Sequence, residues 1–249
     1  MSISMDDRIR RDKELFEEAT KEFGSEWRLR WSRIQKKLKK YSFDFTVVSS
    51  KFIKRIFDII GGAILILLLS PVYLITMIAI KIEDPSGPIF FHQERKGLYG
   101  ESFRMYKFRS MYKDADKRKA ELSDMNEMEG GVIFKIKDDP RITKVGKFIR
   151  KYSIDELPQF YNVLIGDMTL VGPRPPVPGE VALYSRKDKD RLKVKPGITC
   201  IWQVSGRSNI PFEEQVDLDK QYILSQSVWL DIKLLFKTVG AVFKSEGAY

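Results

Sequence analysis

The chain has 249 residues, enough for one domain of ordinary size with additional segments. It carries 44 Lys and Arg against 34 Asp and Glu, and the net charge of +10 predicts an anionic partner such as phosphate, nucleic acid or acidic lipid. Cys200 is the single cysteine and His92 the single histidine, so one chain forms neither a disulfide framework nor a Cys/His zinc site. Any chemistry must therefore rest on carboxylates, Arg and Lys.

Residues 1–50 are densely charged and lack the apolar run and cleavage site of a secretory signal, so we expect the chain to stay on the cytoplasmic side. Residues 1–24 are weakly periodic and indicate a loose helix or a partner contact. Beyond them, one helical face carries four apolar residues among many Arg and Lys: Trp27, Trp31, Ile34 and Leu38. This pattern is typical of a helix in an anionic lipid interface, although a helix packed on the protein's own core shows it too.

An apolar segment, 56–80, is long enough to be a transmembrane helix by length alone, and a straight single-pass anchor is one interpretation. Ser70 and Pro71 interrupt it. Because Pro lacks a backbone donor and clashes with the carbonyl one turn earlier, we expect a kink there, with the Ser70 hydroxyl bonded to a freed carbonyl. Each half then measures roughly 15 to 20 Å, which is short of a hydrocarbon core of about 30 Å.

Basic residues flank both ends of this segment: Lys51, Lys54, Arg55 and Lys81. The positive-inside rule puts both ends on the cytoplasmic face, which a bent hairpin satisfies and a straight span does not. The sequence therefore predicts a re-entrant membrane hairpin over 55–81. Asp58 is expected near the membrane interface, where an ionised group costs less than at the bilayer centre.

After residue 81, turn-rich stretches separate short β-like and helical runs, which predicts a compact α+β domain. The β-like runs include PIFFHQ and FRMYKF. Near the C-terminus, five apolar residues recur at helical spacing: Trp229, Ile232, Phe236, Val239 and Phe243. They predict an amphipathic helix that lies either in the membrane interface or on the protein's own core.

The stretch SIDELPQF places two adjacent carboxylates, Asp155 and Glu156, in an otherwise basic chain. Ser153 and Glu156 have the spacing of a helix capping box, which would give both acids a structural role. If Leu157 is the cap instead, Pro158 takes the favoured first helical position and both acids precede the helix. In that second arrangement the acids are available for chemistry.

Cationic and phosphate-binding motifs surround this acid pair in the sequence: YKFRSM, IRKYS, VGPRPP, KVKPGIT and SGRSN. Arg174 is held between prolines, which preorganises its guanidinium for a phosphate. Carboxylates and cations without histidine suit phosphoryl transfer, in which Mg²⁺ neutralises charge and a carboxylate can act as nucleophile.

From about residue 54 to the C-terminus the sequence resembles the bacterial sugar transferases, or monotopic phosphoglycosyl transferases. The resemblance rests on KRIFDI, the Ser70 and Pro71 break, FFHQERKG, YKFRSM, the long run FKIKDDPRITKVGKFIRKYSIDELPQFYNVLIGDMTLVGPRPP, and KPGITCIWQVSGRS. It implies a fold that is α+β and predominantly helical, in a monotopic membrane protein with a Pro-kinked re-entrant helix and interfacial amphipathic helices. The domain division becomes an extension at 1–50 and a transferase domain at 51–249.

The resemblance also implies an activity: transfer of a sugar-1-phosphate from a UDP-sugar to undecaprenyl phosphate, with release of UMP, as the first membrane step of exopolysaccharide, capsule or glycoconjugate synthesis. Asp155 would be the nucleophile that forms a phosphosugar-aspartyl intermediate, and Glu156 would hold Mg²⁺. Ser70 and Pro71 would form the membrane bend. The implied substrate-binding residues are Lys107, Arg109, Arg150, Pro173, Arg174, Pro175 and Arg207.

The stretch EGGVIFKIKDDPR is similar to members that transfer hexose-1-phosphate, so UDP-glucose or UDP-galactose is the expected donor. Two features depart from the family: Cys200 stands where Gly often follows KPGIT, and a hydrophilic extension replaces the membrane helices of larger members. The expected location is the cytoplasmic face of the bacterial inner membrane, in contact with anionic phospholipid. A homodimer is left open, and nucleic acid is not an expected partner.

Two other functions compete with this one. A non-catalytic peripheral membrane or anion-binding adaptor would use the net charge alone, and its binding would fall steeply with salt. A glycosidase also uses paired carboxylates, but they must lie about 5 Å or more apart across a sugar, which adjacent residues rarely achieve.

Overall fold

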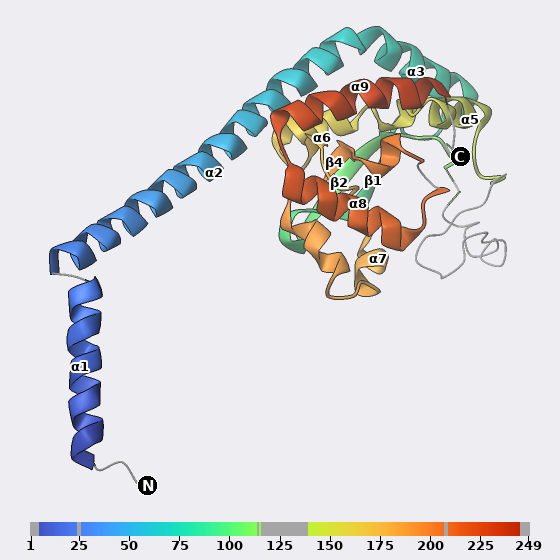
Figure 1. Ribbon diagram of the computed structural model, residues 1–249. Helices are drawn as coiled ribbons and strands as arrows, with labels where there is room; N and C mark the ends of the chain where they lie inside the picture. The colour runs from blue at the N-terminus through green and yellow to red at the C-terminus, as the bar shows by residue number, and fades with distance from the viewer. Residues whose placement is uncertain (1–4, 24–25, 114, 116–138, 207–208, 245–249) are drawn as a thin grey trace. The chain divides into compact units, whose positions relative to one another are not determined.

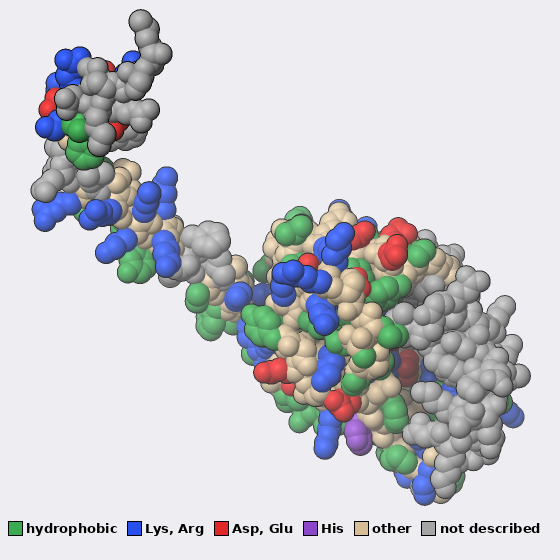
Figure 2. All heavy atoms as spheres, turned by 90° about the horizontal axis from the view of Figure 1, so that it is seen from below, with side chains coloured by type: hydrophobic (Ala, Val, Ile, Leu, Met, Phe, Trp, Pro, Cys, Tyr) green, Lys and Arg blue, Asp and Glu red, His purple; other side chains and the backbone are tan. Residues whose placement is uncertain are grey.

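The computed structural model describes residues 5–23, 26–113, 115, 139–206 and 209–244 (Figure 1). The chain forms two units, Met1–Ile53 and Lys54–Tyr249. The first contains helix α1 (Met5–Phe23) and the first part of helix α2 (Glu26–Leu68). Weak periodicity predicted only a loose helix for the first segment, whereas α1 is a regular helix of 19 residues. Lys and Arg side chains alternate with apolar ones along this unit (Figure 2).

The second unit begins with the remainder of α2 and helix α3 (Ser70–Glu83), which meet at the expected break. The two helices are bent by 59°. The Ser70 hydroxyl donates to the Leu67 carbonyl at 2.8 Å, which confirms the predicted local partner of the kink. No single helix in the described part of the chain is long and apolar enough to cross a membrane, but the bent pair passes that test together.

One side of the bent pair packs against protein, and the other side is uncovered within the described residues. Phe57 and Leu65 of α2, and Tyr73 and Met77 of α3, contact buried core residues. The uncovered apolar side chains are between 40% and 77% exposed: Ile59, Ile60, Ile64, Leu67, Leu68, Leu74, Ile75, Ile78 and Ile82. A surface of this kind on a monomeric soluble protein would be unusually apolar, so it needs a covering partner.

Two small sheets stand beside the helices. Strands β1 (Phe90–Lys96) and β2 (Ser102–Phe108) form an antiparallel hairpin through the short 3₁₀ helix η1 (Leu98–Gly100), as the two β-like runs predicted. Strands β3 (Thr169–Val171) and β4 (Gly197–Thr199) pair in parallel. A Cβ on Gly197 would lie 2.0 Å from the Gly172 nitrogen, so glycine is required where these backbones approach.

The remaining elements surround these sheets (Figure 1). They are helices α5 (Lys144–Lys151), α6 (Gln159–Ile165), α7 (Pro178–Ala182), α8 (Phe212–Ser225) and α9 (Val228–Lys244), and 3₁₀ helices η3 (Ile154–Glu156), η4 (Asp188–Lys193) and η5 (Trp202–Val204). The principal core is contributed by β2, α6, β3 with the residue before it, α8 and α9: Met105, Val163, Met168, Leu170, Val171, Tyr222 and Leu234. The α+β, predominantly helical class is therefore confirmed for the described residues.

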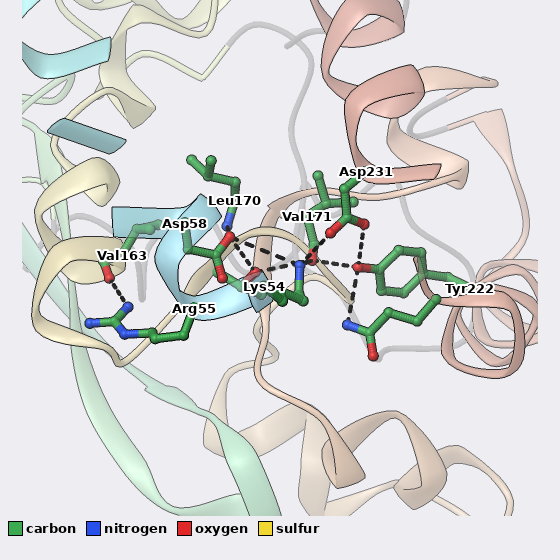
Figure 3. A network of polar contacts seen from close by, with 10 residues as sticks. Lys54, Arg55, Asp58, Val163, Leu170, Val171, Tyr222 and Asp231 are labelled. Carbon is green, nitrogen blue, oxygen red and sulfur yellow. Dashed lines mark hydrogen bonds and ion pairs between the residues drawn. The ribbon is translucent and has the colours of Figure 1, made fainter. Parts of the chain in front are cut away.

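A buried polar network attaches α2 to this core (Figure 3). Lys54 Nζ lies 2.6 Å from Asp231 Oδ2 and donates to the Val171 carbonyl at 3.2 Å. Asp231 is completely buried, and the Tyr222 hydroxyl lies 2.8 Å from its Oδ1. The network joins residues more than a hundred positions apart in the sequence, so it fixes the helix on the second unit.

Asp58 and Arg55 extend this attachment. Asp58 was expected near the membrane interface, but it is only 3% exposed and accepts from the Thr169 hydroxyl at 2.9 Å and the Leu170 backbone N–H at 3.0 Å. Arg55 donates to the carbonyls of Val163 and Leu164 at the end of α6. The sequence interpretation of Lys54 and Arg55 as simple membrane flanks missed these contacts.

Helix α9 has one packed face and one exposed face. Leu234 is 3% exposed within the core, whereas Trp229 and Phe236 are 78% and 76% exposed and Val239 is 57% exposed. Helix α9 therefore packs on the protein's core through residues other than Trp229, Phe236 and Val239. The exposed face is the one that the periodicity of Trp229, Phe236 and Val239 marked.

Candidate active site

The acid pair lies in a tight turn between α5 and α6. Ser153 adopts the left-handed conformation, with φ 54° and ψ 22°, which is uncommon for a residue other than glycine. The 3₁₀ helix η3 then carries Asp155 and Glu156, and α6 starts at Gln159 with Pro158 as its cap residue. The Ser153 side chain makes no capping bond, so the capping-box interpretation is wrong and both acids precede the α-helix.

Lys107 of β2 contacts both carboxylates. Its Nζ donates to Glu156 Oε1 at 2.6 Å and lies 3.9 Å from Asp155 Oδ2. The Asp155 residue is 8% exposed, whereas the Glu156 side chain is 33% exposed. One lysine therefore balances two adjacent acids, of which one is buried and one faces outward.

These surroundings separate the pKa values of the two acids. Burial, with a smaller contribution from the adjacent Glu156, raises the pKa of Asp155 to about 6 despite the opposing effect of Lys107. Burial also raises the pKa of Glu156, but Lys107 and Arg174 outweigh it, and the pKa falls below its usual value. Two carboxylates with divergent pKa values are a feature of catalytic pairs.

Contacts from three directions hold the turn in place. Ile154 and Leu157 pack with Ile80, Phe108 and Ile149. The Tyr73 hydroxyl of α3 donates to the Leu157 carbonyl at 2.5 Å, so the bent helix pair contacts the acid turn directly.

Asn162 of α6 joins the acid turn to the hairpin strand that carries Lys107. It is fully buried, its side-chain amide donates to the Arg104 carbonyl at 2.7 Å, and its Oδ1 accepts from the Tyr106 N–H at 3.0 Å. Both bonds are made to β2 residues that directly precede Lys107. The register between α6 and β2 thereby sets which strand residue meets the acids.

A small pocket opens beside Glu156, and several predicted site residues line it. Lys107, Glu156, Arg174 and Pro175 come from separate motifs of the sequence and meet here. Arg174 Nη1 is 3.5 Å from Glu180 Oε2, which holds its guanidinium while leaving the side chain 32% exposed. The other lining residues are Arg95, Met105, Gln159, Gly197, Ile198 and Gln203. Three cations and one carboxylate give this pocket the charge expected for binding an anion.

Arg95 is a pocket residue that the sequence interpretation missed. It is 7% exposed, donates to the Pro175 carbonyl at 2.9 Å, and its Nε has no hydrogen-bond partner among the described residues. Burial and the nearby Arg174 lower the pKa of Arg95 to about 10. Its motif, FFHQERKG, was noted as a family feature, but nothing in the sequence distinguished this Arg from the many others.

The remaining predicted residues lie elsewhere or are engaged in other bonds. Arg109 donates to Asp84 Oδ2 at 2.6 Å and to the Asp84 carbonyl at 2.8 Å, so it closes the turn after α3. Arg150 donates to the Ser110 hydroxyl and interacts electrostatically with Asp155. Pro173 is fully buried beside Arg174. Arg207 and most of the EGGVIFKIKDDPR stretch lie outside the described residues.

Cys200, the departure from the family pattern, contacts the pocket-lining residue Gln203. It is completely buried, and its Sγ donates to Gln203 Oε1 at 3.1 Å. Burial raises the pKa of the thiol, which keeps it protonated and unreactive. The thiol thus orients a pocket-lining amide and takes no direct part in chemistry.

The acid pair also suits a magnesium ion bound together with a substrate. Within the described residues, no three acidic, histidine or cysteine side chains form a metal-binding group. Mg²⁺ commonly takes only one or two protein carboxylates and completes its shell with water and substrate phosphates. Glu156, a carboxylate partly exposed at the pocket, has the chemistry that such a site would need.

Comparisons with known proteins give the family of the chain. The family model described as "Bacterial sugar transferase" matches residues 49–245, and the chain belongs to this family. It is 51% identical over 209 residues to the "Galactosyl transferase CpsE" of Streptococcus agalactiae serotype III, covering 84% of this chain and 46% of that protein.

Two further relatives differ in length. The "Undecaprenyl-phosphate galactose phosphotransferase" of Salmonella typhimurium is 43% identical over 204 residues, 81% of this chain and 42% of its own. The "Exopolysaccharide production protein ExoY" of Rhizobium meliloti is 39% identical over 199 residues, 79% of this chain and 88% of its own. The chain thus spans less than half of the first two relatives and most of the third.

Proposed function

We propose that the protein transfers a hexose-1-phosphate from a UDP-sugar to undecaprenyl phosphate and releases UMP. The observation that carries this proposal is the acid pair, bound by one lysine at the edge of a cationic pocket. Membership of the sugar transferase family and the printed names of the relatives support the same reaction class.

In the first step, an ionised Asp155 oxygen attacks the phosphorus that is bonded to the sugar. The bond between this phosphorus and the bridging oxygen breaks, and UMP leaves with the bonding electron pair. The product on the enzyme is an acyl phosphate between Asp155 and the sugar phosphate. Lys107 lies near both carboxylates and offsets negative charge as the donor approaches.

In the second step, an oxygen of the lipid phosphate attacks the same phosphorus. The acyl phosphate bond breaks, Asp155 regains its carboxylate, and the lipid carries a sugar diphosphate. A soluble donor and a lipid acceptor must reach one carboxylate in turn, so the reaction is expected to follow ping-pong kinetics. The Tyr73 contact places α3 against the acid turn, close to where a lipid phosphate would arrive.

Mg²⁺ would be held by Glu156 and would supply charge neutralisation of the donor diphosphate. Arg174 and Arg95 face the same pocket and would bind the anionic part of the donor. Among donors, galactose appears in the names of two of the reported relatives, so UDP-galactose is the first choice and UDP-glucose the second.

We also propose that α2 and α3 enter the cytoplasmic face of the bacterial inner membrane as a re-entrant hairpin. The 59° bend and the uncovered apolar residues on both helices support this placement. A shallow insertion would bring the acid turn to the height of the lipid headgroups.

The test is release of UMP by the purified full chain with Mg²⁺, undecaprenyl phosphate and a panel of UDP-sugars. We expect one hexose donor to dominate, lipid phosphate to be required for turnover, and Asp155→Asn to abolish release. Lys144→Gln, on α5 but remote from the acid contacts, is the control for general damage. Full turnover by Asp155→Asn would remove Asp155 from the nucleophile role. If no UDP-sugar of the panel gives UMP with folded protein in lipid, the result would favour the non-catalytic adaptor.

A further inference from the structure

The first unit carries an apolar pattern that the proposed reaction does not use. Along α2, apolar residues recur at alternating intervals of four and three: Trp27, Trp31, Ile34, Leu38, Tyr41, Phe45, Val48 and Phe52. We call these eight positions the heptad seam. They fill both core positions of each seven-residue repeat without a polar interruption, which is the pattern of a coiled coil.

The period of the seam favours a helix as its partner over a lipid surface. A straight α-helix has 3.6 residues per turn, so a strict seven-residue repeat drifts by about 20° in each heptad unless two helices coil around each other. Between Trp31 and Tyr41 every residue outside the seam is polar or charged. A helix in a lipid interface commonly has a wider apolar face than two positions in seven.

The seam side chains at Ile34, Leu38, Tyr41, Val48 and Phe52 are exposed, and α2 is a continuous helix there. Ile34 is 45% exposed, Leu38 is 61% exposed and Tyr41 is 69% exposed. Val48 and Phe52 are 66% and 65% exposed. Helix α1, with 19 residues, measures about 28 Å, whereas the seam from 27 to 52 measures about 39 Å, so α1 is too short to cover it fully.

The charges beside the seam are compatible with a parallel arrangement of two identical helices. In a parallel pair, residues next to the core meet partners five positions further along: Arg30 with Gln35, Lys37 with Ser42, and Asp44 with Ser49. None of these pairs places like charges together. An antiparallel pair centred on the seam would bring Arg30 beside Lys51, which repel, but also Lys37 beside Asp44, which attract, so the direction of the pair is decided by the cross-linking test below.

We propose that the heptad seam is a self-association surface that binds the same segment of a second copy of this chain in a parallel coiled coil. Since each seam ends where the second unit begins, a parallel pairing joins two transferase units at one end of the coil. Leu38 and Ile34 occupy the two core positions of the repeat in an order that also allows assemblies of more than two helices. The mass of the assembly is therefore part of the test.

Cysteine cross-linking of the full chain in lipid nanodiscs tests the pairing and its direction. Ile34→Cys puts a thiol in the seam, whereas Lys36→Cys puts one on the opposite face of the same turn. A parallel, in-register pair brings the two seam thiols within disulfide reach. We expect Ile34→Cys to form at least tenfold more covalent dimer than Lys36→Cys. Cys200 is fully buried and should not interfere, which the unmodified chain will check.

Light scattering of the detergent-solubilised full chain gives an independent measure. We expect a mass of two or more chains, and dissociation to monomer on Leu38→Asp but not on Lys36→Gln, which lowers the net charge equally. A monomeric unmodified chain, or equal cross-linking from both faces, would overturn the proposal. Protection of the Ile34→Cys thiol from a water-soluble maleimide by phosphatidylglycerol but not by neutral lipid, without covalent dimer, would overturn the proposal and assign the seam to lipid.

Discussion

Asp155 must be ionised to attack phosphorus, and its pKa of about 6 sets the pH at which this becomes possible. We predict that the single-turnover rate of UMP release rises as the pH increases through about 6 and levels off above it. Lys107 lowers this pKa, so Lys107→Met should move the midpoint to higher pH and slow the reaction at neutral pH. Rapid-quench measurement between pH 5 and 8 tests this, and an unmoved midpoint in the variant would contradict it.

The buried Nε of Arg95 predicts a role in donor binding. Hydrogen bonds to a charged group contribute about 1.5 to 3 kcal/mol, so Arg95→Met should lower kcat/KM for the UDP-sugar by roughly 10- to 150-fold. Arg104, an exposed residue of β2, provides the matched control, because Arg104→Met removes the same charge away from the pocket. A similar loss in both variants, measured with saturating lipid phosphate, would rule out a specific contact.

At this scale the sequence predicted much of the site. The unusual acid pair and the proline-held Arg174 marked it, and the structure brings Glu156, Lys107 and Arg174 to one pocket. The ion pair of Arg109 with Asp84 was not foreseen, because Asp84 lies 25 positions away and only the turn after α3 brings the two residues together. Arg95 was missed because burial, which no single residue type reveals, distinguishes it from solvated arginines.

Among the elements, the attachment of α2 to the core depends on a buried charge pair. Removing one partner of such a pair leaves an uncompensated buried charge, at a cost of about 3 to 5 kcal/mol. We predict that Lys54→Met lowers the midpoint of thermal unfolding in detergent strongly, because it leaves Asp231 without its cation. Lys51→Met, one turn earlier and exposed, should change it little.

A double-mutant cycle separates this pair from general effects on the helix. Adding Asp231→Leu to Lys54→Met should recover part of the lost stability, since neither charge is then buried alone. Additive losses would show that the two residues act independently. The sequence could not foresee the pair, because Lys54 next to an apolar run also satisfies the positive-inside rule.

The parallel strands β3 and β4 depend on the close approach of two glycines. A Cβ on Gly197 would overlap the backbone of Gly172, and overpacking of this kind typically costs about 1 to 3 kcal/mol. We predict that Gly197→Ala destabilises the protein and, since Gly197 lines the pocket, lowers turnover. Gly179→Ala, where a Cβ meets no atom within 4 Å, should be neutral in both circular dichroism melts and UMP release.

Local sequence signals predicted the elements better than the contacts between them. The kink at Ser70 and Pro71 follows from proline chemistry, and the hairpin of β1 and β2 follows from β-like runs around a turn. The 3₁₀ turn that carries the acids was not predicted, because its geometry depends on the left-handed Ser153 and on packing against α3. Both influences act through space and leave no short motif.

For the whole molecule, the bend between α2 and α3 decides how the chain meets a membrane. If the pair forms a re-entrant hairpin, both flanks must lie on the cytoplasmic side, whereas a straight span would expose the second flank outside. Lys51 and Ser86 are exposed residues on the two flanks. Because Cys200 is buried, Lys51→Cys and Ser86→Cys each introduce one accessible thiol.

We predict that a membrane-impermeant maleimide labels neither variant in intact bacterial cells with a permeabilised outer membrane, and labels both after the inner membrane is opened. Pro71→Ala in the Ser86→Cys background probes the cause of this topology, because restoring the lost backbone donor favours a straighter helix. Partial labelling of the Pro71→Ala, Ser86→Cys double variant in intact cells would show that Pro71 determines the re-entrant topology. Labelling of Ser86→Cys alone in intact cells would refute the hairpin. Because Tyr73 holds α3 against the acid turn, that result would also place the acid turn away from the cytoplasmic pool of UDP-sugars.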